Sequence, residues 1–198
     1  TMRMLDMAKE NVHQAFSVFA KRNDKLFEEL EAREGYVDFL NKEIAKYITS
    51  VVSYENTKVG SKIFNCLYTI TSNIERISDH AINIAEYSGM ITEKKIVFSK
   101  FAQAEIAEMQ KVCDQMFEIL LDKQEDVVKW HEQMAAMEQK IDDLTEQYRN
   151  NMYERIQTGV CSDEGSILFS EMLTDFERIG DHALNISSEM LKIAMAEK

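Results

Sequence analysis

Residues 73–84 read NIERISDHAINI, and a closely similar string, DFERIGDHALNI, returns at residues 175–186. Eight of the twelve positions are identical, and five of these eight carry the polar side chains Glu, Arg, Asp, His and Asn. An internal repeat indicates that one structural unit was duplicated. Packing alone would retain the apolar residues and let the polar ones change. The repeat therefore indicates a duplicated fold and a role for its polar side chains.

Helical periodicity extends over most of the chain, since apolar residues recur three and four positions apart. The 198 residues include no proline and only 6 glycines, so few residues interrupt a long helix. The pattern predicts helices over residues 4–31, 36–52, 53–87, 99–122, 125–157 and from 162 or 163 to the C-terminus. Short loops between such helices predict an all-α fold of two tandem antiparallel three-helix bundles.

The expected division falls between residues 91 and 92, so that each bundle is one repeat. Gly35 and Gly89 are expected to end helices, and Ser53 is expected to cap the third one. In the second helix, Tyr47 is expected to point inward with the apolar stripe.

The net charge of −12 argues against nucleic acid and against anionic lipid as partners, because both require a basic surface. Cations, or basic surfaces of another protein, are the natural counterparts. The three widely spaced cysteines, Cys66, Cys113 and Cys161, are expected to be reduced thiols in a cytosolic protein. The sequence shows no signal peptide and no apolar run of about 18 residues that would span a bilayer.

A row of polar side chains lies on the side of each third helix that faces away from its apolar stripe. Its members are Glu75, Asp79 and Asn83 in the first repeat and Glu177, Asp181 and Asn185 in the second. Two carboxylates at i and i+4 repel each other, so their retention in both copies suggests a positive ligand. Carboxylate and amide oxygens are hard donors, suited to Fe³⁺, Mn²⁺, Mg²⁺ or Ca²⁺. The carboxylates are the main candidate ligands, and the two asparagines are secondary ones.

The second repeat offers further carboxylates. Asp175 stands where the first repeat has Asn73, and Glu138 and Asp142 form another i, i+4 pair on the preceding helix. Aligning residues 40–44 with residues 137–141 places Asn41 and Ala45 opposite this pair. The second repeat is therefore expected to hold the better metal site, and the first a partial one.

Each of these patterns also has a structural explanation that involves no bound ligand. An acidic i, i+4 pair is commonly a solvated helix face, and Arg76 and Arg178 are placed to neutralise the neighbouring Glu residues. His80 and His182 lie at the border of the apolar stripe, where a packing role is favoured over ligation.

Catalytic signatures are missing from the chain. Di-iron bundles need two Glu-x-x-His units, and only Glu10 and His13 have that spacing. The sequence also has no glycine-rich phosphate loop, no HExxH and no GxSxG. A metal-dependent enzyme acting on phosphate species would need a general base, and no residue of the sequence can be identified as one. We therefore expect no enzymatic activity.

The two Glu-x-x-x-Asp motifs, Glu75 to Asp79 and Glu177 to Asp181, resemble the signature of the PhoU family. The resemblance to this family covers nearly the whole chain. This resemblance implies helical bundles that carry metal ions, iron or zinc in the first place, at these carboxylates. It also implies a regulatory role in phosphate uptake rather than catalysis.

A finer resemblance concerns residues 43–51, EIAKYITSV, which look like the second helix of PhoU-like domains attached to bacterial sodium/phosphate cotransporters. It implies a cytoplasmic domain tethered to the inner face of the membrane, with the transporter portion of the same chain as partner; a start at Thr1 agrees with an excised domain. A free-standing PhoU-type regulator with another phosphate-uptake protein as partner, a metal-free interaction module and a homodimer all stay open.

Overall fold

The computed structural model describes residues 1–21, 23–55, 57–122 and 125–196, and these residues form six α-helices. The helices are α1 (Met2–Ala20), α2 (Asp24–Val52), α3 (Lys58–Lys94), α4 (Lys100–Leu121), α5 (Val127–Gln157) and α6 (Asp163–Ala196). The all-α prediction with six long helices is confirmed.

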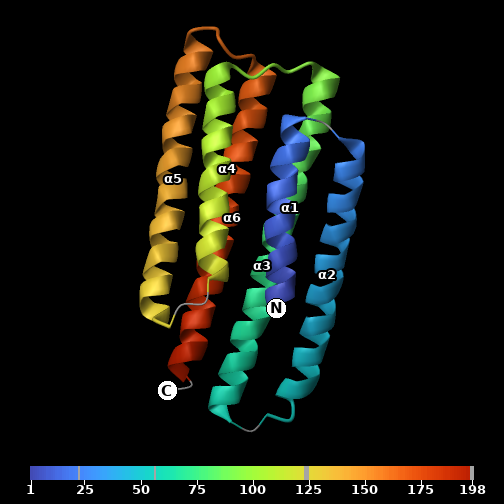
Figure 1. Ribbon diagram of the computed structural model, residues 1–198, viewed down its shortest axis with the longest axis vertical. Coiled ribbons are helices and arrows are strands. Elements are labelled where there is room, and N and C mark those ends of the chain that lie inside the picture. Colours follow the sequence, from blue (N-terminus) through green and yellow to red (C-terminus); the bar gives the residue numbers. More distant parts are fainter. Residues whose placement is uncertain (22, 56, 123–124, 197–198) are drawn as a thin grey trace.

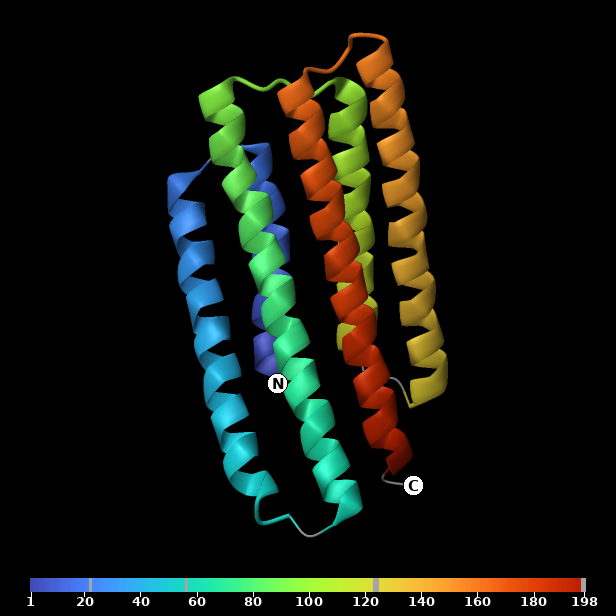
Figure 2. The ribbon, with the colours of Figure 1, turned by 180° about the vertical axis from the view of Figure 1, so that it is seen from behind.

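The helices form two antiparallel three-helix bundles that lie side by side (Figure 1). Helices α1–α3 make the first bundle and α4–α6 the second, and α3 packs along α6 where the bundles meet. Seen from behind, α2, α3, α6 and α5 follow one another across the molecule, with α1 and α4 on the far side (Figure 2). The third helix of each repeat therefore lies at the centre, between its own second helix and the other repeat.

One hydrophobic core runs through both bundles and includes the apolar stripes of the two repeated strings. Ile77 in α3 and Ile179 in α6, equivalent residues of the repeat, are both fully buried. Phe16 of α1 stacks on Phe176 of α6 with ring centroids 5.2 Å apart, which joins the two bundles. Burying the stripe forces the polar residues between its members toward the helix flanks.

The helix ends differ from the prediction at the loops after α1, α2 and α3, and the start of α6 agrees with it. The first helix ends at Ala20, because Asn23 caps α2 and accepts a hydrogen bond from the backbone N–H of Leu26. Thr57, not Ser53, caps α3 by accepting from the N–H of Gly60. Ser162 caps α6 by accepting from the N–H of Gly165, as expected.

Gly35 and Gly89 do not end helices; they lie inside α2 and α3. No atom beyond the glycine's own helical turn lies within 4 Å of a Cβ added at either position, so neither glycine serves a close approach to another element. The third helix instead ends at Lys94, and Lys95 adopts the left-handed conformation with φ of 54°. The expected division after residue 91 stays a prediction, although α3 runs past it. Tyr47 is 66% exposed, so its inward placement was wrong.

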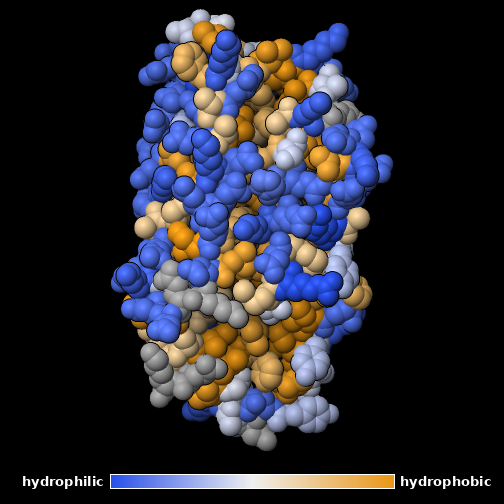
Figure 3. Space-filling model, viewed as in Figure 1, coloured by the Kyte–Doolittle hydropathy of each residue, from blue (hydrophilic) through white to orange (hydrophobic). Residues whose placement is uncertain are grey.

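Polar residues cover most of the face seen in Figure 3, and an apolar area lies toward its lower end. The three cysteines are free, as expected. Within the described parts of the chain, no helix has the length and apolar character needed to cross a membrane.

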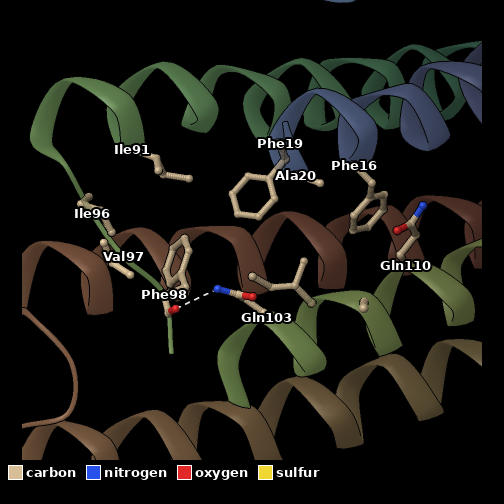
Figure 4. A pocket seen from close by; sticks show the side chains of 11 residues that line it. Phe16, Phe19, Ala20, Ile91, Ile96, Val97, Phe98, Gln103 and Gln110 are labelled. Carbon is tan, nitrogen blue, oxygen red and sulfur yellow. Dashed lines mark hydrogen bonds between the residues drawn. The ribbon is translucent and has the colours of Figure 1, made fainter. Parts of the chain in front are cut away.

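An apolar pocket of about 370 Å³ lies where α1 ends and the connection from α3 enters α4 (Figure 4). Phe16, Phe19 and Phe98 form much of its wall, and none of the described residues that line it is charged. Gln103 is held there by donating a hydrogen bond to the carbonyl oxygen of Phe98. The pocket belongs to the packing between the bundles and lies apart from the repeated carboxylates.

Candidate functional site

Four carboxylates from two helices form the first acidic cluster, which we define as Glu34, Asp38, Glu75 and Asp79. Burial raises the pKa of Glu34, and the charges of Asp79 and Asp38 raise it further. The pKa of Glu75 is raised by burial and then by Asp79, with Asp38 and Glu34 adding to the effect. Helix α2 therefore adds its own Glu-x-x-x-Asp pair to the pair on α3.

Basic side chains accompany this cluster. Lys42 donates to Asp38 at 2.6 Å, and Arg76 lies 3.8 Å from Asp79 and 4.0 Å from Glu75. The side chains of Lys42 and Arg76 are 66% and 63% exposed. Exposed ion pairs of this kind contribute little, so these two cations neutralise the cluster only weakly.

The second acidic cluster, defined as Glu138, Asp142, Glu177 and Asp181, has the same construction on α5 and α6. The pKa of Glu138 is raised by burial and by the charges of Asp142, Asp181 and Glu177. Burial, Glu177 and Asp181 likewise raise the pKa of Asp142. In each repeat, the four carboxylates thus lie close enough for their negative charges to act on one another.

Two arginines contact the second cluster. Arg178 donates to Asp181 at 3.0 Å, and Arg149 donates to Glu177 at 3.1 Å. One oxygen of Asp142, Oδ1, is buried and has no hydrogen-bond partner among the described residues. A buried carboxylate oxygen without a partner is costly in a native protein, and a bound cation would satisfy it.

Core packing positions both clusters at their helix crossings. Ile141, fully buried, lies between Glu138 and Asp142, and Val37 has the same place between Glu34 and Asp38. In α6, a Cβ added to Gly180 would lie 3.2 Å from Ile141 Cδ1, so the glycine allows α5 close to α6.

The second helices consequently align at an offset of 104 residues, because Glu34 matches Glu138 and Asp38 matches Asp142. Buried residues support the same register, since Leu30 then matches Met134. The predicted offset of 97 was wrong by seven residues, two helical turns. Asn41 and Ala45 are therefore not the counterparts of Glu138 and Asp142. The reason for expecting a partial site in the first repeat is thereby removed, because both repeats contribute four carboxylates. Which repeat binds metal stays a prediction.

Asp175 lies apart from the second cluster, in a polar seam between α3 and α6 where it is 5% exposed. Its carboxylate accepts hydrogen bonds from His80 Nδ1 at 2.7 Å, Asn83 Nδ2 at 3.2 Å and Tyr87 Oη at 2.7 Å. Burial and the bond to Asp175 raise the pKa of Tyr87. Asp175 is thus fully engaged in joining the two bundles.

The other half of the seam has Asn73 at its centre. Its Oδ1 accepts from His182 Nδ1 at 2.8 Å and from Asn185 Nδ2 at 3.3 Å. The rings of His80 and His182 stack with centroids 5.6 Å apart. Burial, followed by the charge of His80, lowers the pKa of His182 to about 4. The packing role expected for the two histidines agrees with this arrangement.

Three predicted candidates, Asp175, Asn83 and Asn185, therefore lie in the seam, and the structure does not bring them to the acidic clusters. Of the polar row predicted along each third helix, only the residues up to Asp79 in α3 and up to Asp181 in α6 belong to an acidic cluster. Two ligand candidates, Glu34 and Asp38, were missed. The repeated Glu-x-x-x-Asp spacing on α2 and α5 was the signal that would have found them.

The donor chemistry of the clusters fits a hard metal ion, since each offers up to eight carboxylate oxygens from two adjacent helices. Across the described residues, no three His, Cys, Asp or Glu side chains are already gathered as ligands of one ion. Several of the carboxylates are already in ion pairs, since Lys42 contacts Asp38, Arg149 contacts Glu177 and Arg178 contacts Asp181. Binding therefore requires these side chains to exchange a basic partner for the ion.

Comparison with known proteins identifies the class of protein. A family model described as the PhoU domain matches residues 1–88 and 106–190. The chain belongs to the PhoU family.

Two curated proteins are similar over most of their length. A phosphate-specific transport system accessory protein PhoU homolog of Thermotoga maritima is 26% identical over 96% of this chain and 82% of its own. A PhoU homolog of Clostridium acetobutylicum, also named as an accessory protein of that system, is 20% identical over 93% and 84%.

Two crystal structures share the fold. PhoU of Pseudomonas aeruginosa superposes with a TM-score of 0.87 over 98% of this chain and 92% of that chain, at 15% identity. The phosphate transport system regulatory protein PhoU of Streptococcus pneumoniae gives 0.80 over 98% and 90%, at 13% identity. These relatives are PhoU accessory and regulatory proteins rather than cotransporter domains.

Proposed function

We propose that this chain is a non-enzymatic regulator of phosphate transport whose two acidic clusters bind metal ions. The observation that carries the proposal is the pair of four-carboxylate clusters, each built from a second and a third helix. In each cluster burial raises the pKa of carboxyl groups, and the charges of the neighbouring carboxylates raise it further. Proteins of the PhoU family are known to bind metal ions. Iron and zinc are the first candidates, followed by Mn²⁺, Mg²⁺ and Ca²⁺.

The relatives support a regulator rather than an enzyme, since they are named as accessory or regulatory proteins. They also favour a free-standing PhoU-type regulator over a domain of a sodium/phosphate cotransporter. We place the protein in the cytoplasm, with a component of a phosphate-uptake system as partner. The three free cysteines agree with a reducing compartment.

A bound ion would change the electrostatics of each bundle. It would neutralise carboxylates that now repel one another, and it would bridge α2 to α3 or α5 to α6. Because binding favours the folded state, the ion stabilises the bundle and presents a less acidic surface to a partner. The residues that hold it are Glu34, Asp38, Glu75 and Asp79 in the first cluster, and Glu138, Asp142, Glu177 and Asp181 in the second.

The direct test is metal analysis of protein purified without chelator, followed by reloading with iron, zinc or Mn²⁺. The wild type should retain metal, and the variant Glu75→Gln/Asp79→Asn/Glu177→Gln/Asp181→Asn should retain less than a tenth as much. The reason is that each cluster loses both carboxylates of its third helix.

Asp114→Asn/Glu118→Gln is a matched control, because these residues form an i, i+4 acidic pair on α4 outside both clusters. Its metal content should equal that of the wild type. Background metal in the wild type, or full metal content in the fourfold variant, would refute the proposal and leave a metal-free interaction module.

A further inference from the structure

Arg149 is the basic residue that ties α5 to α6 at the second acidic cluster. Its Nη2 donates to Glu177 Oε2 at 3.1 Å and to Thr174 Oγ1 at 3.0 Å, and both acceptors belong to α6. The guanidinium is held more firmly than a free surface cation, since its side chain is only 33% exposed and has two fixed acceptors.

Among the described residues of the first repeat, no basic side chain joins α2 to α3 in this way. At the offset of 104 residues, Ala45 takes the place of Arg149. Among the described ion pairs, the basic side chain that contacts an α2 carboxylate of the first cluster is Lys42, which bonds Asp38 on its own helix and is 66% exposed. The hydrogen bond to Asp38 raises the pKa of Lys42 and the charge of Glu75 on α3 adds to this effect, but no hydrogen bond from Lys42 to α3 is among the described contacts. Glu75 has Arg76, at 4.0 Å, as its nearest basic neighbour among the described contacts.

The difference bears on cation binding through two physical effects. Arg149 occupies an oxygen of Glu177 that an ion would otherwise use, so the ion has to displace it. Its fixed positive charge also repels a cation inside a partly desolvated site, where charges interact more strongly than in water. Arg178 cannot account for the difference, because Arg76 has the equivalent place in the first repeat.

We propose that Arg149 sets the cation affinity of the second acidic cluster, acting as an internal competitor that makes this cluster bind more weakly than the first. This inference rests on the proposed metal binding by the clusters and names the residue that distinguishes them. It predicts that the first cluster fills at a lower metal concentration and the second only when the concentration rises.

The experiment isolates the second cluster with the background variant Glu75→Gln/Asp79→Asn and uses Mn²⁺ as the probe. Free Mn²⁺ is followed by electron paramagnetic resonance during titration, at fixed pH and salt. Arg149→Ala, which installs the residue of the first repeat, should bind Mn²⁺ about fivefold more tightly, or about 1 kcal/mol at 25 °C. Arg149→Lys should fall between Arg149→Ala and the background.

The reciprocal variant is Ala45→Arg in the background Glu177→Gln/Asp181→Asn, which isolates the first cluster. It should bind Mn²⁺ more weakly than its own background. Circular dichroism and the melting temperature of each metal-free variant check its folding. If Arg149→Ala does not fold, Arg149→Gln decides, because it removes the charge and keeps a hydrogen-bond donor.

Unchanged or weaker Mn²⁺ binding by the charge-removing variant overturns the inference while leaving the clusters as metal sites. Binding that is absent from the background and appears on removing Arg149 supports it. Absence of Mn²⁺ binding from the wild type and all variants overturns both the inference and the proposed function.

Discussion

The two acidic clusters have the same four carboxylates and differ in their basic residues. Each combines two Glu-x-x-x-Asp pairs on adjacent helices, and each keeps an arginine after the Glu of the third helix. The first has the exposed Lys42. The second has the half-buried Arg149 and one carboxylate oxygen, Asp142 Oδ1, that has no hydrogen-bond partner among the described residues. The duplicated unit thus preserved its negative charge and changed its counter-ions, as expected if the two proposed cation sites differ in affinity.

The seam between α3 and α6 shows a similar contrast. One half is centred on the anionic Asp175 with three donors, and the other on the neutral Asn73 with two donors from side chains. A buried anion depends more strongly on its donors than a neutral amide does. The seam is next to both clusters along the chain, since the seam residue His80 follows Asp79 and the seam residue His182 follows Asp181.

The largest effect on stability is expected for the seam. Asp175→Ala leaves three donors unpaired in a buried place and should lower the free energy of unfolding by about 3 kcal/mol, whereas Asn73→Ala should cost about 1–2 kcal/mol. Urea denaturation at pH 7 measures both. Metal content per folded molecule should stay the same in each variant, because neither residue belongs to a cluster. An equal loss for the two variants would contradict the contrast between the halves.

Much of the fold was predictable because apolar periodicity and the absence of proline leave few alternatives to long helices. Helix ends were less predictable: Gly35 and Gly89 are tolerated within helices, where no neighbour approaches them. Their cost within a helix is modest, about 1 kcal/mol each, and long helices absorb it.

The candidate site was predictable on the third helices, where the whole string repeats. On the second helices only the spacing repeats, and a shift of seven residues returns the same helix face, so the apolar pattern allowed the wrong register. The seam was not predictable, because the direction in which Asn83 and Asn185 point depends on how α3 packs against α6.

A smaller effect is expected from pH, and it concerns His182. Its folded-state pKa of about 4 lies below the ordinary value of 6.5, so its neutral form stabilises the fold fully above about pH 6.5. This contribution is lost as the pH falls toward 4, because the unfolded chain takes up the proton first. Between pH 7 and pH 5 the loss should amount to about 1–2 kcal/mol.

The carboxylates with raised pKa values act in the opposite direction, so the comparison needs a matched variant. His182→Gln keeps a donor for Asn73 and has no titrating ring. The difference in unfolding free energy between wild type and His182→Gln, measured by urea denaturation, should narrow as the pH falls from 7 to 5. A difference that stays constant over this range would contradict the buried, neutral state of His182.

The central claim is that both clusters are metal sites, each built from four carboxylates. The most direct measurement is the metal content of Glu34→Gln/Asp38→Asn, reloaded at saturating metal and compared with Glu138→Gln/Asp142→Asn and with Asn41→Ala. Each double variant should lose about half of the metal that the wild type retains, and Asn41→Ala should lose none. Full metal content in Glu34→Gln/Asp38→Asn would contradict the claim and restore the first repeat as a partial site.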